Sequence, residues 1–326
     1  MPNIIMHHHF GKVVYSALSE DIKKAIDDVK LYDFATSGPN CFEKIQFLNN
    51  KHNKDNQAFS DFMHTHKSKE FFLKMIEMAR VDYHMFSYLC GFLTHYYLDA
   101  YTNPFITHLS GVYNVNDEST IDYRGLNQKL KIAYDCYVIE NYYDSKANAF
   151  NIHNKILKLR KVNPEFKESL DRLYSSIYGK NDGYKYVNSA VRWQRIYYGL
   201  TFDRFGLLNK ILTKKDDGKS QTDLRYISYH NKKIDVTKLD IFNLKHNTWY
   251  NPVDNDIQSN ESFFDLFDKA KKITVECIND LYKYVVDGES FDFDYYFKDL
   301  SYYTGFPCAY NLEMKYFDNF LKKDLF

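Results

Sequence analysis

The strongest constraint on the fold is the spacing of apolar residues, which recur every three or four positions along nearly the whole chain. The clearest case is one broad stripe made by Phe263, Leu266, Phe267, Ala270, Ile273, Cys277, Ile278 and Leu281. Such a stripe is typical of a helix with one buried face. Glycine and proline, which interrupt helices, number only 12 and 6 in 326 residues, so long helices are favoured over many short strands. The chain is therefore predicted to be an all-α, multi-helix bundle.

The same spacing locates individual helices. They are expected over residues 8–18, 126–143, 166–178, 187–212 and 263–285, with two more that begin near positions 68 and 82, the second running through position 98. Ser68 and Asp82 are expected to cap these two helices, because their side chains can accept a hydrogen bond from a free N–H of the first turn. The polar segment 214–223 is predicted to be an exposed loop, and residues 226–237 to form a short hairpin.

One boundary is suggested, near Asn163 and Pro164. It divides the chain into residues 1–160 and a helical C-terminal extension, residues 161–326. The extension is expected to pack on the first part within the same domain.

Charge, hydropathy and cysteine spacing exclude several classes of protein. Lys+Arg and Asp+Glu are both 43, so no basic surface argues for a nucleic-acid partner. The most apolar stretch, residues 85–98, is too short to span a bilayer, and the first residues lack the pattern of a signal peptide. The five cysteines are odd in number and form no C-x-x-C pair, which excludes a zinc ribbon. We therefore predict a cytoplasmic protein without a transmembrane segment.

The histidines cluster in the first third of the chain. Nine of the 12 lie within residues 1–108: His7, His8, His9, His52, His64, His66, His84, His95 and His108. Imidazole is the commonest nitrogen ligand of protein-bound metals. This clustering is what a metal site between helices requires.

The segment GFLTHYYLDAYTNP, residues 91–104, places His95 and Asp99 four positions apart. On a helix these side chains share one face about 5–6 Å apart, and both can reach one cation at about 2.0–2.2 Å. Gly91, one turn earlier, lets another backbone approach closely. By itself a His–Asp pair at this spacing is more often a simple hydrogen bond. His64 in MHTHKSKEFF and His7 in MHHHFG, each of which alone could be a solvated loop histidine, supply further imidazoles near helix ends.

Taken together, these segments resemble the bacterial zinc-dependent phospholipase C family, in particular its leaderless cytoplasmic branch, whose helical fold is similar to that of the S1/P1 nucleases. The matching pieces cover most of the chain: the MP…HHFG start, FATSGPN (34–40), MHTHKSKEFF (63–72), GFLTHYYLDAYTNPFI (91–106) and FNLKHNTWYNPV…SFFDLFDKA (242–270).

The resemblance implies a helical bundle that holds up to three zinc ions. In the family a zinc-activated water attacks a phosphodiester, and an Asp can act as general base. Carried over by position, His7, His64, His95 and Asp99 are expected to be metal ligands, with Asp99 bridging two ions. His108 lies just beyond the position of the family's next histidine. The implied substrate is a phosphate ester or a phospholipid headgroup.

This chain departs from the family pattern at four ligand positions. The family's Gly-Pro-Asp ends here in Asn40, and a His before Pro is replaced by Asn103. The family's later His-x-x-x-Glu falls on Tyr123 and Asn127, neither of which is a strong zinc ligand. Asp122, next to Tyr123, is a candidate substitute oxygen ligand.

A reduced site remains after these replacements. His64, His95 and Asp99 are expected to hold one zinc ion, with His7 at a second, weaker position. Asn40 and Asp99 are the candidate catalytic residues, with Asn40 orienting water rather than accepting its proton. The sequence favours a phospholipase C-like phosphoric ester hydrolase. Two alternatives stay open, a non-catalytic metal-binding or scaffold descendant and a helical nuclease or nucleotidase.

Overall fold

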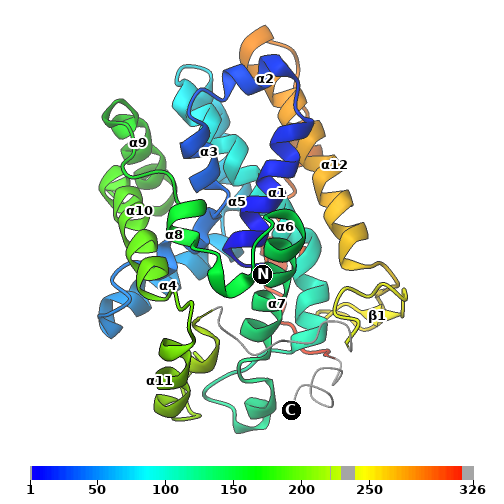
Figure 1. Cartoon of the computed structure of the whole chain (residues 1–326). Helices are drawn as coiled ribbons and strands as arrows, with labels where there is room; N and C mark the ends of the chain where they lie inside the picture. Colours follow the sequence, from blue (N-terminus) through cyan, green and yellow to red (C-terminus); the bar gives the residue numbers. More distant parts are fainter. Residues whose placement is uncertain (1, 221, 229–238, 318–326) are drawn as a thin grey trace.

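The computed structural model describes residues 2–220, 222–228 and 239–317. In these residues the chain is a bundle of helices with almost no strand, which confirms the predicted all-α fold (Figure 1). The helices are α1 (Ile4–Ala17), α2 (Glu20–Ala25), α3 (Val29–Ala35), α4 (Asn50–Thr65), α5 (Ser68–Ala79), α6 (Tyr83–Ser110), α7 (Leu126–Tyr142), α8 (Ile152–Lys155), α9 (Lys167–Tyr178), α10 (Gly183–Leu200), α11 (Leu207–Lys215), α12 (Phe263–Tyr282) and α13 (Phe293–Tyr296). The two-residue strands β1 (Trp249–Tyr250) and β2 (Gln258–Ser259) pair antiparallel.

Helix α6 is the centre of the bundle. It is buried on nearly every side and packs against α1, α3, α5, α7 and α12, as its continuous apolar sequence requires. Its 28 residues continue past position 98 to Ser110 and include Pro104. Proline removes one hydrogen bond of the helix, and the tertiary contacts of the buried residues around it hold the helix together.

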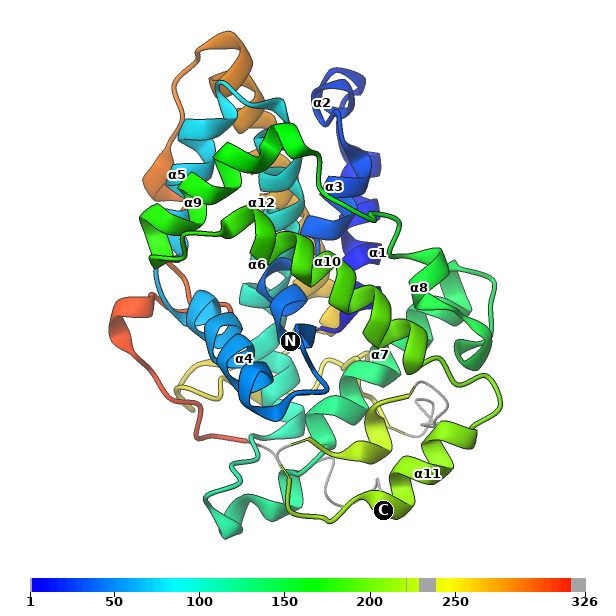
Figure 2. The ribbon, with the colours of Figure 1, turned by 90° about the vertical axis from the view of Figure 1, so that its left-hand side faces the viewer.

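The remaining helices cover α6 in groups. Figure 2 shows α4, α9 and α10 on one face of the bundle, where α10 packs against α9 and against the 3-10 helix η1 (Gly38–Lys44). Helix α12 lies along α6 and α1. Elements from both sides of position 160 therefore contact each other directly. None of the described helices combines the length and the apolar character needed to cross a membrane.

The predicted helix at 187–212 is two helices. Helix α10 ends at Leu200, and α11 begins after Gly206, which has a positive φ of 74°. The carboxylate of Asp203 accepts a hydrogen bond from the backbone N–H of Asn209 at 2.7 Å. This bond stabilises the start of a new helix, which explains the break.

The two predicted caps have different outcomes. Asp82 accepts hydrogen bonds from the first turn of α6 and caps it as predicted. The prediction for Ser68 was wrong, because Ser68 is buried and its hydroxyl donates to Asp299 at 2.9 Å. The same carboxylate accepts a hydrogen bond from Lys69 N–H. Helix α5 is thus capped by a residue 230 positions away, which local sequence does not reveal.

The segment 214–223 is only partly the exposed loop that was predicted. Its first two residues end helix α11, and Asp216 and Asp223 fold back onto a buried Arg124. The guanidinium of Arg124 donates two hydrogen bonds to Asp216, at 2.7 and 2.8 Å. Most of the hairpin predicted at 226–237 lies outside the described residues.

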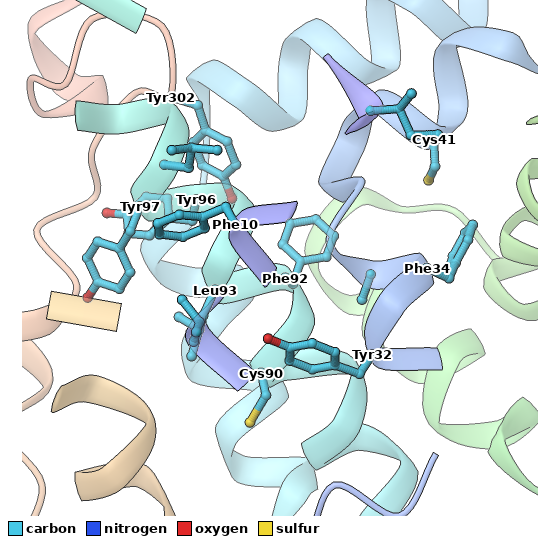
Figure 3. Close-up of a cluster of buried hydrophobic side chains, with 14 of the residues drawn as sticks. Phe10, Tyr32, Phe34, Cys41, Cys90, Phe92, Leu93, Tyr96, Tyr97 and Tyr302 are labelled. Atoms are coloured by element: carbon cyan, nitrogen blue, oxygen red, sulfur yellow. The ribbon is translucent and has the colours of Figure 1, made fainter. Parts of the chain in front are cut away.

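The largest fully buried side chains of the core are aromatic. Figure 3 shows part of it, including Phe10, Phe92, Tyr96 and Tyr302. Buried tyrosines are tolerated because their hydroxyls find partners; Tyr32, for example, donates to the carbonyl of Gly11 at 2.8 Å.

Candidate metal centre

His95 and Asp99 form the centre of the site, on the buried middle of α6. Both are 0% exposed, and His95 Nε2 lies 3.0 Å from Asp99 Oδ2. The spacing of four residues thus places both side chains on one helix face, as expected. One turn earlier, a Cβ on Gly91 would lie 2.3 Å from the carbonyl oxygen of Tyr32. The expected close approach at Gly91 is therefore made by α3.

The backbone that follows α3 orients the His95 ring. Nδ1 of His95 lies 3.2 Å from the carbonyl oxygen of Thr36. A carbonyl can only accept, so Nδ1 carries the proton and Nε2 of the neutral ring presents a lone pair toward Asp99. Gly38 has φ +48° and lies against the ring, where a Cβ would be 2.3 Å from two imidazole carbons. Glycine is required here by both conformation and space.

His64 enters from the last turn of α4. Its Nδ1 lies 2.7 Å from the carbonyl of Ser60 and donates to it, so its Nε2 also presents a lone pair. That Nε2 is 3.4 Å from Nε2 of His95 and 3.9 Å from Oδ2 of Asp99. A histidine whose other nitrogen donates to a backbone carbonyl is the usual arrangement of a metal ligand.

His7 approaches from the opposite side, on the first turn of α1. Its Nε2 lies 3.3 Å from Oδ1 of Asp99, and its ring stacks on His95 with centroids 4.1 Å apart. The start of α1 is held by Asp135 of α7, which accepts hydrogen bonds from Ile5 N–H and Met6 N–H. Asp135 was not predicted to be important. The sequence shows it as an acidic residue among the apolar residues of α7, but only the fold shows that it binds the start of α1.

The buried carboxylate of Asp99 dominates the electrostatics of this cluster. Neither oxygen of Asp99 accepts a hydrogen bond from the described residues. Burial opposes ionisation of Asp99, but His95 and His7 outweigh it and hold the pKa of Asp99 well below its ordinary value. Burial, reinforced by His95, lowers the pKa of His7 to about 4 and that of His64 to about 3. At neutral pH His7 and His64 are therefore uncharged beside a buried carboxylate that accepts no hydrogen bond from the described residues, and a cation would stabilise this arrangement.

The separations also suit a metal ion. Ligand atoms of His7, His95 and Asp99 all lie within 4.8 Å of one another. Two ligands at about 2.0–2.1 Å from a tetrahedral zinc ion are about 3.3 Å apart, close to the 3.0–3.9 Å found between Asp99 and the three imidazoles. These residues fit a divalent cation.

Asn40, the other expected catalytic residue, lies in η1 and lines a cavity that His7 also lines. Its Oδ1 is buried and has no hydrogen-bond partner among the described residues. The structure thus brings Asn40 to the His7 side of the cluster.

The other replaced positions have structural contacts. Asn103, one turn after Asp99 on α6, donates to a backbone carbonyl of the C-terminal segment at 2.6 Å. Asn127 donates to the hydroxyl of Ser110 at 2.9 Å. The Tyr123 ring packs so closely on Gly111 that a Cβ there would lie 2.1 Å from it. His108 packs near Trp249. It does not belong to the group of His7, His95 and Asp99 whose ligand atoms lie close together.

Comparison of the chain with protein-family models, with curated proteins and with solved structures finds no match.

Proposed function

We propose that this protein is a zinc-dependent phosphoric ester hydrolase, similar to the zinc-dependent phospholipases C but with a reduced metal site. The observation that carries the proposal is the carboxylate of Asp99, which is fully buried, accepts no hydrogen bond from the described residues and faces three imidazoles. A carboxylate in this setting is stabilised by a bound cation far better than by the neutral rings alone.

The two oxygens of Asp99 face different partners, which supports a bridging role. Oδ2 faces His95 and His64, and Oδ1 faces His7. The first group offers three ligands, as catalytic zinc sites do. His7, whose Nε2 lies closer to the carboxylate than that of His64 does, groups with His95 and Asp99 and is proposed to form a second position. Zinc, when bound, supplies a Lewis acid for a phosphoryl oxygen and lowers the pKa of water.

We assign to Asn40 the role of orienting water, which is supported by its position in the wall of the cavity that His7 also lines. An amide cannot accept a proton as a carboxylate does. Loss of a general base lowers a rate by about 10²–10⁴-fold. We therefore propose slow hydrolysis, with the chain's contribution limited to holding the metal and positioning the reactants.

A second candidate is a metal-binding scaffold without catalysis. It is favoured by one observation, the use of Asn103 and Asn127 in hydrogen bonds that hold neighbouring segments together. Under this alternative the cluster of His64, His95 and Asp99 binds zinc for stability alone.

Zinc titration followed by a turnover assay separates the two. His64→Ala is compared with wild type and with His66→Ala, a matched control because His66 is exposed and two positions away. Zinc-dependent turnover of bis(p-nitrophenyl) phosphate by wild type and His66→Ala, but not by His64→Ala, supports the hydrolase. Zinc binding without turnover supports the scaffold. Zinc binding that is equal in all three proteins would refute the metal centre.

A further inference from the structure

A small cavity lies next to the metal centre, beyond His7. Its volume is about 50 Å³, and a buried water needs roughly 10–15 Å³ of such space. The cavity therefore accepts a few waters or one tetrahedral anion. Its polar lining includes His7, Asn40, Glu43, Lys44, Lys131 and Gln194.

The lining carries an excess positive charge. Lys44 forms an ion pair with Glu43 at 3.1 Å, so these two charges compensate each other. Lys131 of α7 has no carboxylate within 4.0 Å and makes no side-chain hydrogen bond among the residues described here. Burial lowers the pKa of Lys131, although Glu43 and Asp99 act in the opposite direction. Lys131 is partly exposed, and its ammonium is the positive charge of the described lining that no carboxylate within 4.0 Å compensates, which suits an anion.

The rest of the wall adds little to this charge. Asn3 and Ile4, at the start of α1, line the cavity, but the N–H groups of Ile5 and Met6 donate to Asp135, so a carboxylate already caps this helix end. Gln194 is 2% exposed, and its Oε1 has no hydrogen-bond partner in the described chain. This unpaired atom is an acceptor, so it suits a water or the protonated oxygen of a hydrogen phosphate.

We propose that this cavity is a phosphate subsite, in which the Lys131 ammonium holds the phosphate group of the substrate beside His7. The identification of the anion as phosphate rests on the proposed function; the charge and size of the cavity do not. A phosphate group fills the space, so the rest of an ester substrate extends out of the cavity. Lys131 binds the substrate rather than the metal.

Calorimetric titration with inorganic phosphate tests the subsite on zinc-free protein. Wild type is compared with Lys131→Gln, Lys131→Arg and Lys129→Gln. Lys129 lies on the same helix, two positions away, and does not line the cavity. We expect Lys131→Gln to weaken phosphate binding about tenfold or more, with Lys131→Arg intermediate and Lys129→Gln unchanged. Wild-type affinity in Lys131→Gln, or no phosphate binding by wild type, would overturn the inference.

A measurement on wild type alone covers the case in which the Lys131 variants fail to fold. Lysine acetylation is followed by mass spectrometry with and without phosphate. Phosphate is expected to slow modification of Lys131 and leave Lys129 unaffected. Equal rates at Lys131 would overturn the subsite.

Repeating the titration with zinc-loaded protein distinguishes this inference from the proposed function. Lys131-dependent phosphate binding without ester turnover supports the subsite and refutes the hydrolase. Phosphate binding that requires zinc and ignores Lys131 overturns the subsite and leaves the metal centre standing. Glycerophosphocholine in place of inorganic phosphate distinguishes a lipid headgroup from free phosphate, and Lys131-dependent binding of either one supports the inference.

Discussion

Nε2 of His95 and Oδ2 of Asp99 lie 3.0 Å apart in the middle of a buried helix, yet the carboxylate oxygen accepts no hydrogen bond from any described residue. Because Nδ1 of His95 donates to the Thr36 carbonyl, the atom that faces Asp99 in the neutral ring is an acceptor. Two acceptors at this distance repel each other, and either a bound metal ion or a proton on Nε2 of His95 relieves the repulsion.

Replacing His95 should reduce bound zinc. His95→Ala removes one of three imidazoles around Asp99, and we expect zinc content at limiting metal to fall by about an order of magnitude or more. Elemental analysis of the purified protein measures this. His84→Ala is the control, since His84 lies on the same helix and contacts Asn163 instead of Asp99. Unchanged zinc in His95→Ala would remove this site from consideration.

Neutralising Asp99 should destabilise the protein, and more so with metal than without. In zinc-free protein, Asp99→Asn removes a buried carboxylate whose ionised form His95 and His7 favour, so the free energy of unfolding should fall by about 1–3 kcal/mol. Zinc should stabilise wild type, because a ligand that binds only the folded state adds to stability, and should leave the variant unchanged. Urea denaturation with and without zinc measures both effects. A variant at least as stable as wild type without zinc would contradict the favourable contacts of the Asp99 carboxylate with His95 and His7.

Gly38 should be much less tolerant of substitution than a glycine of similar conformation elsewhere. Gly38→Ala adds a methyl group 2.3 Å from the His95 ring at φ +48°, and we expect it to destabilise the fold by about 2–5 kcal/mol and weaken zinc binding. Gly179→Ala is the matched control, because Gly179 has φ +68° and nothing within 4 Å of the added Cβ. It should lose only about 1–2 kcal/mol. Thermal denaturation and zinc titration compare the two, and equal losses would mean that the contact with His95 is not close.

The ion pair between Arg124 and Asp216 should make stability depend on pH in acid. The hydrogen bonds from Arg124 lower the pKa of Asp216 from 3.8 to about 2. A lowered carboxyl pKa contributes stability that is present above pH 3.8 and is lost as the pH falls toward 2. Relative to Asp216→Asn, wild type should be more stable by about 1–2 kcal/mol at pH 6, and the difference should shrink below pH 4. Urea midpoints between pH 3 and 7 measure it; a difference independent of pH would contradict the pair.

Local periodicity accounts for the parts of the structure that were predicted correctly. Helices α6, α7 and α12 have apolar stripes or continuous apolar runs, and their positions follow from 3.6 residues per turn. The shared face of His95 and Asp99 follows from the same geometry. Helix α4, in contrast, was not predicted, because most of its residues are polar and exposed.

Contacts between distant residues account for the errors. Asp299 replaces Ser68 as the cap of α5, and Arg124 draws Asp216 and Asp223 out of the predicted exposed loop. The local sequence indicates whether a residue tends to cap a helix or to face solvent. It does not indicate which distant residue will bind that side chain in the folded protein.

The amino-acid sequence by itself therefore determined the all-helical architecture and the i, i+4 pairing of His95 with Asp99, because both depend on the repeat of a single helix. Only the tertiary structure decided that His64 and His7 meet Asp99 on its two oxygens, and that Lys131 lies in a cavity beside them. These residues come from four different helices, whose relative positions are determined by packing in the shared core.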